Sequence, residues 1–475
     1  MIKHRLIRRS LSWIVGLLIF VSSQAIYSQG YDIKVTVRNI KDTVAYLGYH
    51  FGDQKFVKDT SLVMNGDQLH FKGEDPLAPG VYFVYAPSIY FELIVNEQKF
   101  SVETDTVDYV RSMKFHGSKE NTLFNKFQLT MGDSRKESQD LSEKIKGLDK
   151  EKDSEQIAEF RKQLQKIGEE LNDYQQGIID DNKGTYVSKL LLAMKRVDVP
   201  DAPLDQDSKP IENWQYYYYK EHFFDNLDLS DSSLLRSPVY QPKIDEFMEK
   251  MTFKHPDSIA LSADVVLKKS ESNRETFRYN LVKLTNKYET SNIMGMERVF
   301  LHLAENYYLT GKAYWADDEL VEKFRERVKD LSPNQIGNIA PEMVVRDTTL
   351  ELVTLSSVPN RFIVLFFYDP DCGHCKKAMN TLKGAYKNLQ EKDVEVFAAC
   401  TVTDIDKWKK YVKTNKLEWI NVSDPYVQSN FRADYDLKTT PVIYILNSDK
   451  EIIAKKIGAE QVEDFIDRMI KIEEG

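Results

Sequence analysis

Residues 361–379, RFIVLFFYDPDCGHCKKAM, are the most informative about the fold of the C-terminal part of this chain. The first part of this stretch, Phe362–Tyr368, is a continuous apolar run, which is typical of a strand buried on both faces of a sheet. A turn with two aspartates and a proline follows, and Cys372 then opens a helical pattern of apolar residues that runs to Leu389. The two cysteines of the motif, Cys372 and Cys375, are therefore expected where a buried strand passes into a helix.

Strands and helices continue to alternate after this motif. We expect strands at residues 394–399, 442–446 and 451–455, and helices at residues 405–412 and 461–472. Alternation of this kind is typical of an α/β domain. A polar stretch with a proline, residues 331–334, precedes it, so we place this domain at residues 333–475.

Two regions with different patterns come before this domain. Residues 29–118 contain short alternating apolar runs separated by turn residues, which predicts a small antiparallel β-sandwich. Residues 119–332 are charged and helical, and between Ile157 and Ile178 apolar residues recur at intervals of three and four. This spacing predicts a long helix that packs on the preceding helical stretch as a hairpin, with a coiled-coil contact between two copies as the alternative. We expect the aromatic run WQYYYY, residues 214–219, to pack between helices.

The first 28 residues have the pattern of a secretory signal peptide. A basic start is followed by an apolar run from Leu11 to Val21 and then by small and polar residues. The apolar run is shorter than the roughly 18 to 20 residues of a membrane span, and an uncleaved N-terminal anchor is the alternative. We predict that the mature chain starts between Ile26 and Gly30 and is periplasmic.

Charge and cysteine content exclude several classes of function. A net charge of −9 leaves no basic surplus for binding nucleic acid. The three cysteines are too few for a disulfide-braced framework, and without a second CxxC pair or a close histidine pair we expect no metal site. Lys376 stands where a haem-attachment motif needs histidine, and the residues around Cys400 lack the context of a peroxidase cysteine. We expect Cys400 to be a buried structural thiol, and His222 and His302 to be satisfied core residues.

The spacing of Cys372 and Cys375 suits thiol–disulfide exchange. Residues i and i+3 of a helix share a face, so the two thiols can form a redox-active disulfide with each other. Unpaired backbone N–H groups and the positive end of the helix dipole favour Cys372 as the attacking thiolate, which leaves Cys375 as the resolving thiol. Protonated His374, between the cysteines, would stabilise the thiolate further, whereas Asp369 and Asp371 oppose it.

Residues 334–475 resemble the thioredoxin-like domain of TlpA/ResA-type thiol–disulfide oxidoreductases. The resemblance is carried by residues 366–375 (FFYDPDCGHC), by residues 440–446 (TPVIYIL) and by Gly458. It implies a thioredoxin-like fold, thiol–disulfide exchange without a cofactor, and a cis proline, Pro441, that faces the cysteines. It also implies that the backbone of Thr440 pairs with substrate and that Pro441 keeps metal ions from the thiols. The two preceding regions look like the accessory domains of some exported bacterial members.

Two positions depart from the pattern of cytoplasmic thioredoxins. Asp371 stands where they have tryptophan, and Phe366 where they have a buried acid, so the proton of Cys375 must leave by another route. We expect an exported enzyme that exchanges disulfides with exported proteins carrying thiols or disulfides, with a membrane electron donor as a candidate partner. Reductase, oxidase and isomerase chemistry all use these residues, and the oligomeric state stays open. The alternative is a redox-sensing binding or scaffold protein that uses the dithiol as a switch, because about 300 residues precede the motif domain.

Overall fold

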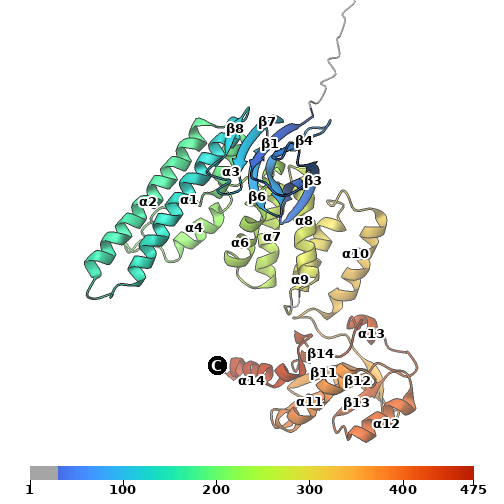
Figure 1. Ribbon diagram of the computed structural model, residues 1–475. Coiled ribbons are helices and arrows are strands. Elements are labelled where there is room, and N and C mark those ends of the chain that lie inside the picture. Colours follow the sequence, from blue (N-terminus) through green and yellow to red (C-terminus); the bar gives the residue numbers. More distant parts are fainter. Residues whose placement is uncertain (1–29, 292, 475) are drawn as a thin grey trace, which may run out of the picture. The chain divides into compact units, whose positions relative to one another are not determined.

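The computed structural model describes residues 30–291 and 293–474 (Figure 1). The predicted signal peptide lies outside these residues. Within them, none of the helices combines the length and the apolar character that crossing a membrane requires. Contacts divide the chain into two units, one built from the residues up to 49 together with 55–187, and one from residues 50–54 together with 188–475.

The first unit begins with two four-stranded sheets that share one hydrophobic core. One sheet has the order β4-β1-β7-β8 and the other the order β3-β2-β5-β6. The strands are β1 Asp32–Arg38, β2 Val44–Phe51, β3 Gln54–Leu62, β4 Gln68–Lys72, β5 Gly80–Ala86, β6 Ile89–Val95, β7 Lys99–Asp105 and β8 Lys114–His116. Alternate residues such as Ile33, Val35 and Val37 face the core, because successive side chains of a strand point to opposite faces. The predicted β-sandwich is confirmed. It includes a parallel pair of strands, β1 and β7, and the chain between these two strands also forms the strands of the other sheet.

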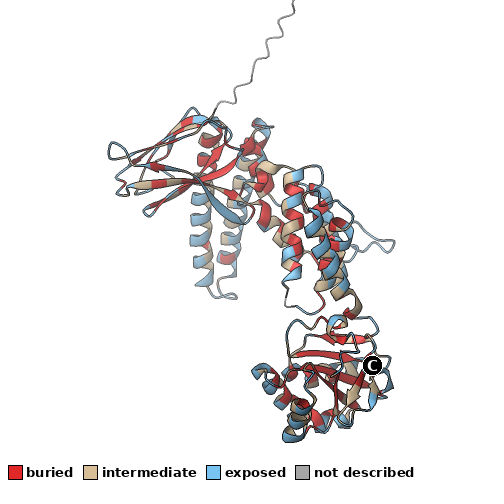
Figure 2. Cartoon of the chain, turned by 90° about the vertical axis from the view of Figure 1, so that its right-hand side faces the viewer, coloured by how far each residue is buried: buried red, intermediate tan, exposed pale blue. Residues whose placement is uncertain are grey.

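The rest of the first unit is mostly a hairpin of two long helices, α1 Lys119–Lys146 and α2 Ser154–Asp181. The two helices lie side by side (Figure 1), so the hairpin predicted from the three-and-four spacing is confirmed. The apolar seam of α2 is buried near its ends, at Ile157 and Ile178; between them it is half-buried, apart from Tyr174, which is exposed. Much of the helical surface in Figure 2 is therefore exposed, as expected where one amphipathic helix covers another.

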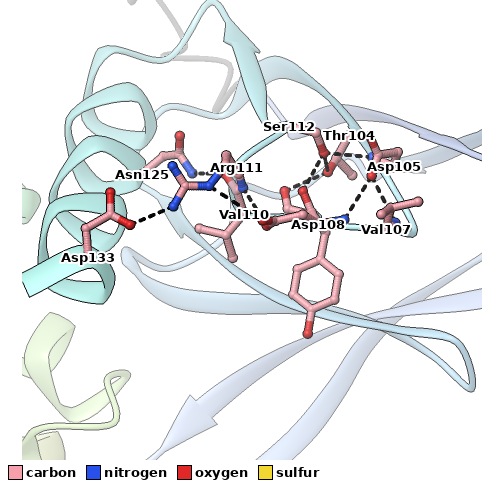
Figure 3. A network of polar contacts seen from close by, with 10 residues as sticks. Thr104, Asp105, Val107, Asp108, Val110, Arg111, Ser112, Asn125 and Asp133 are labelled. Carbon is pink, nitrogen blue, oxygen red and sulfur yellow. Dashed lines mark hydrogen bonds and ion pairs between the residues drawn. The ribbon is translucent and has the colours of Figure 1, made fainter. Parts of the chain in front are cut away.

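Polar contacts fasten the start of α1 to the β-sandwich. The hydroxyl of Ser118 caps the helix by accepting a hydrogen bond from the backbone N–H of Asn121 at 3.1 Å. The Asn121 side chain accepts from the N–H of Ile94 in β6 at 2.7 Å and donates to the carbonyl oxygen of the same residue at 2.6 Å. Figure 3 shows a second connection, in which Arg111 from the loop between β7 and β8 binds Asp133 of α1 at 2.7 Å. These contacts explain why the hairpin groups with the sandwich, whereas the sequence pattern placed a domain boundary at the start of α1.

The second unit contains further helices and an α/β domain. The helices are α4 Trp214–His222, α5 Ser232–Leu235, α6 Tyr240–Lys250, α7 Pro256–Ser270, α8 Arg274–Glu289, α9 Glu297–Leu303 and α10 Asp318–Leu331, while α3 Tyr186–Met194 spans the division between the units. The expected packing of residues 214–219 between helices is wrong for Tyr216 and Tyr217, which are exposed. The Tyr216 hydroxyl reaches a backbone carbonyl at the surface, that of Met251 at 2.9 Å, because a phenol keeps a polar end in contact with hydrogen-bond partners.

The two histidines assigned to the core are partly exposed. His222 lies 2.6 Å from the carboxylate of Asp225, and His302 lies 2.9 Å from that of Asp264. Each is satisfied, as predicted, but by a carboxylate near the surface. A carboxylate loses less solvation there than it would in an apolar core.

The α/β domain is built on a seven-stranded sheet with the order β10-β9-β13-β12-β11-β14-β15. Its strands are β9 Val344–Asp347, β10 Leu352–Thr354, β11 Phe362–Tyr368, β12 Val394–Cys400, β13 Ile420–Ser423, β14 Val442–Leu446 and β15 Ile452–Lys455, and its helices are α11 Gly373–Glu391, α12 Ile405–Asn415, α13 Phe431–Asp434 and α14 Val462–Glu474. β11 lies inside the sheet, parallel to β12 on one side and antiparallel to β14 on the other, and all its residues are buried. Its alternate residues enter two different core clusters, one on each face of the sheet. The expectation of a strand buried on both faces is confirmed. The cysteine motif follows directly after the end of this strand.

Candidate active site

The strand, turn and helix that carry the cysteines place Cys372 at the N-cap of α11. After Tyr368 the turn is closed by two hydrogen bonds, from the N–H of Cys372 to the carbonyl oxygen of Asp369 at 3.2 Å and from the N–H of Asp371 to the Asp369 carboxylate at 2.8 Å. Cys372 has an extended backbone, and its sulfur accepts a hydrogen bond from the N–H of Cys375 at 3.4 Å. The thiol therefore occupies the place that a serine or aspartate side chain takes at an ordinary helix start.

The two thiols of the motif differ in exposure and in acidity. Cys372 is partly exposed, and the hydrogen bond from the backbone N–H of Cys375 holds the pKa of its thiol below the ordinary value. Cys375 is fully buried, and burial raises the pKa of its thiol to about 11, because an apolar environment cannot solvate a thiolate. This is the asymmetry that an attacking thiol and a resolving thiol need.

A segment far along the chain closes the other side of the site. The Thr440–Pro441 peptide bond is cis, as the family resemblance implied, and the Cys372 thiol donates a hydrogen bond to the carbonyl oxygen of Thr440 at 3.4 Å. Pro441 and His374 line a depression of about 310 Å³, together with residues of α11, Ile443 and the segment 456–460. The structure thus brings Cys372, Cys375, Thr440 and Pro441 together.

His374 contacts the site through its backbone. Its side chain is exposed and lines the depression, while its backbone N–H adds a smaller contribution to the lowered pKa of the Cys372 thiol. Any residue type at this position would supply that N–H group. The special role that the sequence suggested for the imidazole therefore stays a prediction.

Comparisons with known proteins show what the C-terminal domain is similar to. Residues 336–455 match the AhpC/TSA family, and residues 152–334 match a domain of unknown function, DUF5106. The thiol–disulfide oxidoreductase ResA from Bacillus subtilis (strain 168) is 25% identical over 125 residues, which are 26% of this chain and 67% of that protein. A domain of a possible thiol–disulfide isomerase from Cytophaga hutchinsonii is 34% identical, and the match covers 29% of this chain and 95% of that one with a TM-score of 0.28. The C-terminal domain of this chain is thioredoxin-like and similar to the TlpA/ResA-type thiol–disulfide oxidoreductases.

Another solved structure matches a longer part of the chain. A thioredoxin-like protein from Bacteroides caccae is 19% identical, with 57% of this chain and 98% of that chain covered and a TM-score of 0.44.

This oxidoreductase keeps its third cysteine away from the surface. Cys400 is the last residue of β12 and is fully buried, and burial raises the pKa of its thiol to about 12. The expectation of a buried thiol is confirmed. Among the described residues, no group of three or more histidine, cysteine or acidic side chains is placed to hold a metal ion.

Two contacts of the oxidoreductase site were missed by the sequence reasoning. Phe366, at the position of the missing acid, is fully buried in the core, and the group that reaches the Cys375 sulfur is the backbone N–H of Asp369 at 3.4 Å. The second contact is an ion pair between Asp371 and Lys407 of α12. A main-chain donor leaves no trace in residue type, and Lys407 lies 36 residues from its partner with no spacing rule to connect them.

Proposed function

We propose that this protein is an exported enzyme that exchanges disulfides with extracytoplasmic proteins through Cys372 and Cys375. The observation that carries the proposal is the contrast between the two thiols. One is accessible at a helix start with a lowered pKa, and the other is buried behind it with a pKa of about 11. An exchange enzyme needs this order, because the first thiol must meet a protein substrate and the second must be held in reserve.

The first step is attack by the Cys372 thiolate on a substrate disulfide. A bond forms between the Cys372 sulfur and one substrate sulfur, the substrate S–S bond breaks, and the departing substrate sulfur leaves as a thiolate that takes up a proton. In the second step the Cys375 thiolate attacks the Cys372 sulfur, which releases the other substrate thiol and leaves a Cys372–Cys375 disulfide. Two electrons have then passed from the enzyme dithiol to the substrate, and the reverse sequence oxidises a substrate dithiol.

The buried position of Cys375 explains how the second step can wait for the first. Burial is the main cause of its raised pKa, and the neighbouring Cys372 thiolate adds to it by charge and by hydrogen bonding. Formation of the mixed disulfide removes that negative charge, so the pKa of Cys375 falls when its thiolate is needed. The N–H group of Asp369 then offers the Cys375 thiolate a hydrogen bond. This is a route to activation that needs no buried acid.

The substrate is proposed to bind across Thr440 and Pro441. The Thr440 carbonyl lies next to the attacking sulfur, and the depression lined by Pro441 and His374 offers space for residues that flank a substrate cysteine. Export is proposed from the signal-peptide pattern of residues 1–28. In that setting the substrates are exported proteins with thiols or disulfides, and a membrane electron donor would renew the dithiol if the enzyme acts as a reductase.

Turnover of a model disulfide tests the proposal. The purified chain should reduce insulin with a thiol reductant present, or oxidise a dithiol peptide from its disulfide form. Cys375→Ser should accumulate a mixed disulfide with substrate, because the attack by Cys372 is kept and its resolution is lost. Cys400→Ser is the matched control and should trap nothing. If the chain turns over neither substrate and Cys375→Ser traps no protein, the enzyme proposal fails and a redox-sensing scaffold becomes the better reading.

A further inference from the structure

Two carboxylates stand directly before the attacking thiol. Asp369 and Asp371 belong to the turn that leads into Cys372, and the Asp369 carboxylate is held in this turn by the N–H of Asp371. A nearby negative charge disfavours a thiolate and so raises the pKa of a thiol. The pKa of the Cys372 thiol is nevertheless below its ordinary value, chiefly because of the hydrogen bond from the backbone N–H of Cys375.

One lysine reaches these carboxylates from another element. Lys407 lies in the first turn of α12, and its ammonium group forms an ion pair with Asp371. The field of Asp369 also acts on this ammonium group. About two-fifths of the Lys407 side chain is exposed, and the Asp371 side chain is more exposed still.

The place of Lys407 is set by its neighbours in α12. Asp404 caps this helix by accepting a hydrogen bond from the N–H of Lys407 at 2.9 Å. The next residue, Trp408, is fully buried in the same core cluster as Cys375. A cap on one side and a core anchor on the other hold the backbone of Lys407 beside the cysteine turn, so the ion pair needs little further ordering of the chain.

We propose that Lys407 is a positioning residue of the exchange site, which neutralises the carboxylates of the turn and thereby lets Cys372 ionise in their presence. The inference rests on the proposed role of Cys372 as the attacking thiol. The titratable and charged groups nearest to Cys372 along the surrounding segments include Asp369 and Asp371 in the turn, His374, Cys375, Lys376 and Lys377 on α11, and Asp404, Asp406, Lys407, Lys410 and Tyr411 on α12 and its cap. Of these, Lys407 is the cation that forms an ion pair with the turn.

The test measures the pKa of Cys372 directly. The reduced full-length chain is alkylated with iodoacetamide over a range of pH, and the modification of Cys372 is followed by mass spectrometry. For Lys407→Gln we expect the Cys372 pKa to rise by about half a unit, as for one charge lost at several ångströms in a largely solvated site. Alkylation should then be about threefold slower below this pKa and equally fast above it. High salt should narrow the difference between wild type and variant, because it screens exposed charges.

Matched variants separate charge from structure. Lys407→Arg keeps the charge, and Lys410→Gln removes an exposed lysine from the same helix; both should give the wild-type profile. Asp371→Asn should lower the Cys372 pKa and should make an added Lys407→Gln change weaker, because the two groups act on each other. If Lys407→Gln matches wild type, or if Lys407→Arg shifts the profile as far as Lys407→Gln, the proposal is overturned.

The same proteins distinguish this inference from the proposed function. A chain with a shifted Cys372 pKa but no turnover would keep the role of Lys407 and lose the enzyme. If turnover is normal but the Cys372 pKa is unshifted in Lys407→Gln, the proposed enzyme function stands and the role of Lys407 is rejected.

Discussion

Two helices of this protein, one in each unit, begin in the same way and serve different ends. Ser118 before α1 and Cys372 before α11 both have an extended backbone, and each side chain accepts a hydrogen bond from the N–H group three residues further on. Ser118 is buried and its hydroxyl also donates to Glu97 at 3.0 Å, so every part of it is used to join helix and sheet. Cys372 is partly exposed and faces the Thr440 carbonyl. A helix start offers the same backbone N–H groups to any capping residue. When the cap is a solvent-accessible thiol, these N–H groups stabilise its thiolate form.

The strongest test of this comparison replaces the cysteine cap of α11 by serine, the residue that caps α1. Cys372→Ser should lower turnover by roughly a thousandfold or more, because a hydroxyl at neutral pH is a far weaker nucleophile than a thiolate. Stability should stay the same or increase by up to about 1 kcal/mol, since serine is a good cap. Turnover and urea unfolding measured on one preparation give both numbers. Residual turnover close to that of wild type would assign the attack to another thiol.

The next test separates the two thiols of the motif by pH. A lowered pKa keeps the Cys372 thiolate populated at pH values below the ordinary thiol pKa, whereas the Cys375 thiol stays protonated until the pH approaches about 11. Alkylation of the reduced chain at pH 8 should therefore modify Cys372 and leave Cys375 untouched. Peptide mapping after a short exposure to iodoacetamide would decide this. Equal labelling of both residues would mean that the burial of Cys375 does not control its reactivity.

The smallest expected effect is on the structural side of the comparison. Ser118→Ala should lower the free energy of unfolding of the first unit by about 1 to 2 kcal/mol, because the N–H of Asn121 loses its partner in a buried place. Turnover should remain within about twofold of wild type, since this cap touches no part of the proposed exchange site. Urea unfolding followed by fluorescence measures the first quantity. A large loss of turnover with an intact fold would show that the two helix starts do not have separate roles.

Much of the cysteine site could be predicted from local sequence. The apolar run of β11, the turn and the helix pattern of α11 lie within one continuous stretch, and the order of the two cysteines follows from which end of the helix they occupy. The cis bond before Pro441 was not derivable from spacing and came from the family resemblance. The α1–α2 hairpin was equally local, because a seam repeating every three or four residues has only a few ways to be buried.

Other features could not be predicted because they depend on polar groups that meet across long stretches of chain. The β-sandwich keeps the α1–α2 hairpin through Asn121 and Ile94, and the aromatic run of α4 stays partly at the surface. A single asparagine or tyrosine carries no periodic signal that names its partner. Patterns of apolar residues state which face is buried, but they do not state what buries it.

Neighbouring residues encode the buried strand, the helix and the cysteine spacing, so a dithiol at the junction of strand and helix follows from the amino-acid sequence. The inequality of the two thiols arises only when the chain folds. The burial of Cys375, the approach of the Thr440 carbonyl to Cys372 and the ion pair of Lys407 with Asp371 each join segments that are distant in the chain. The pKa of a thiol depends on the solvent, charges and hydrogen bonds within a few ångströms, and those are properties of the folded chain.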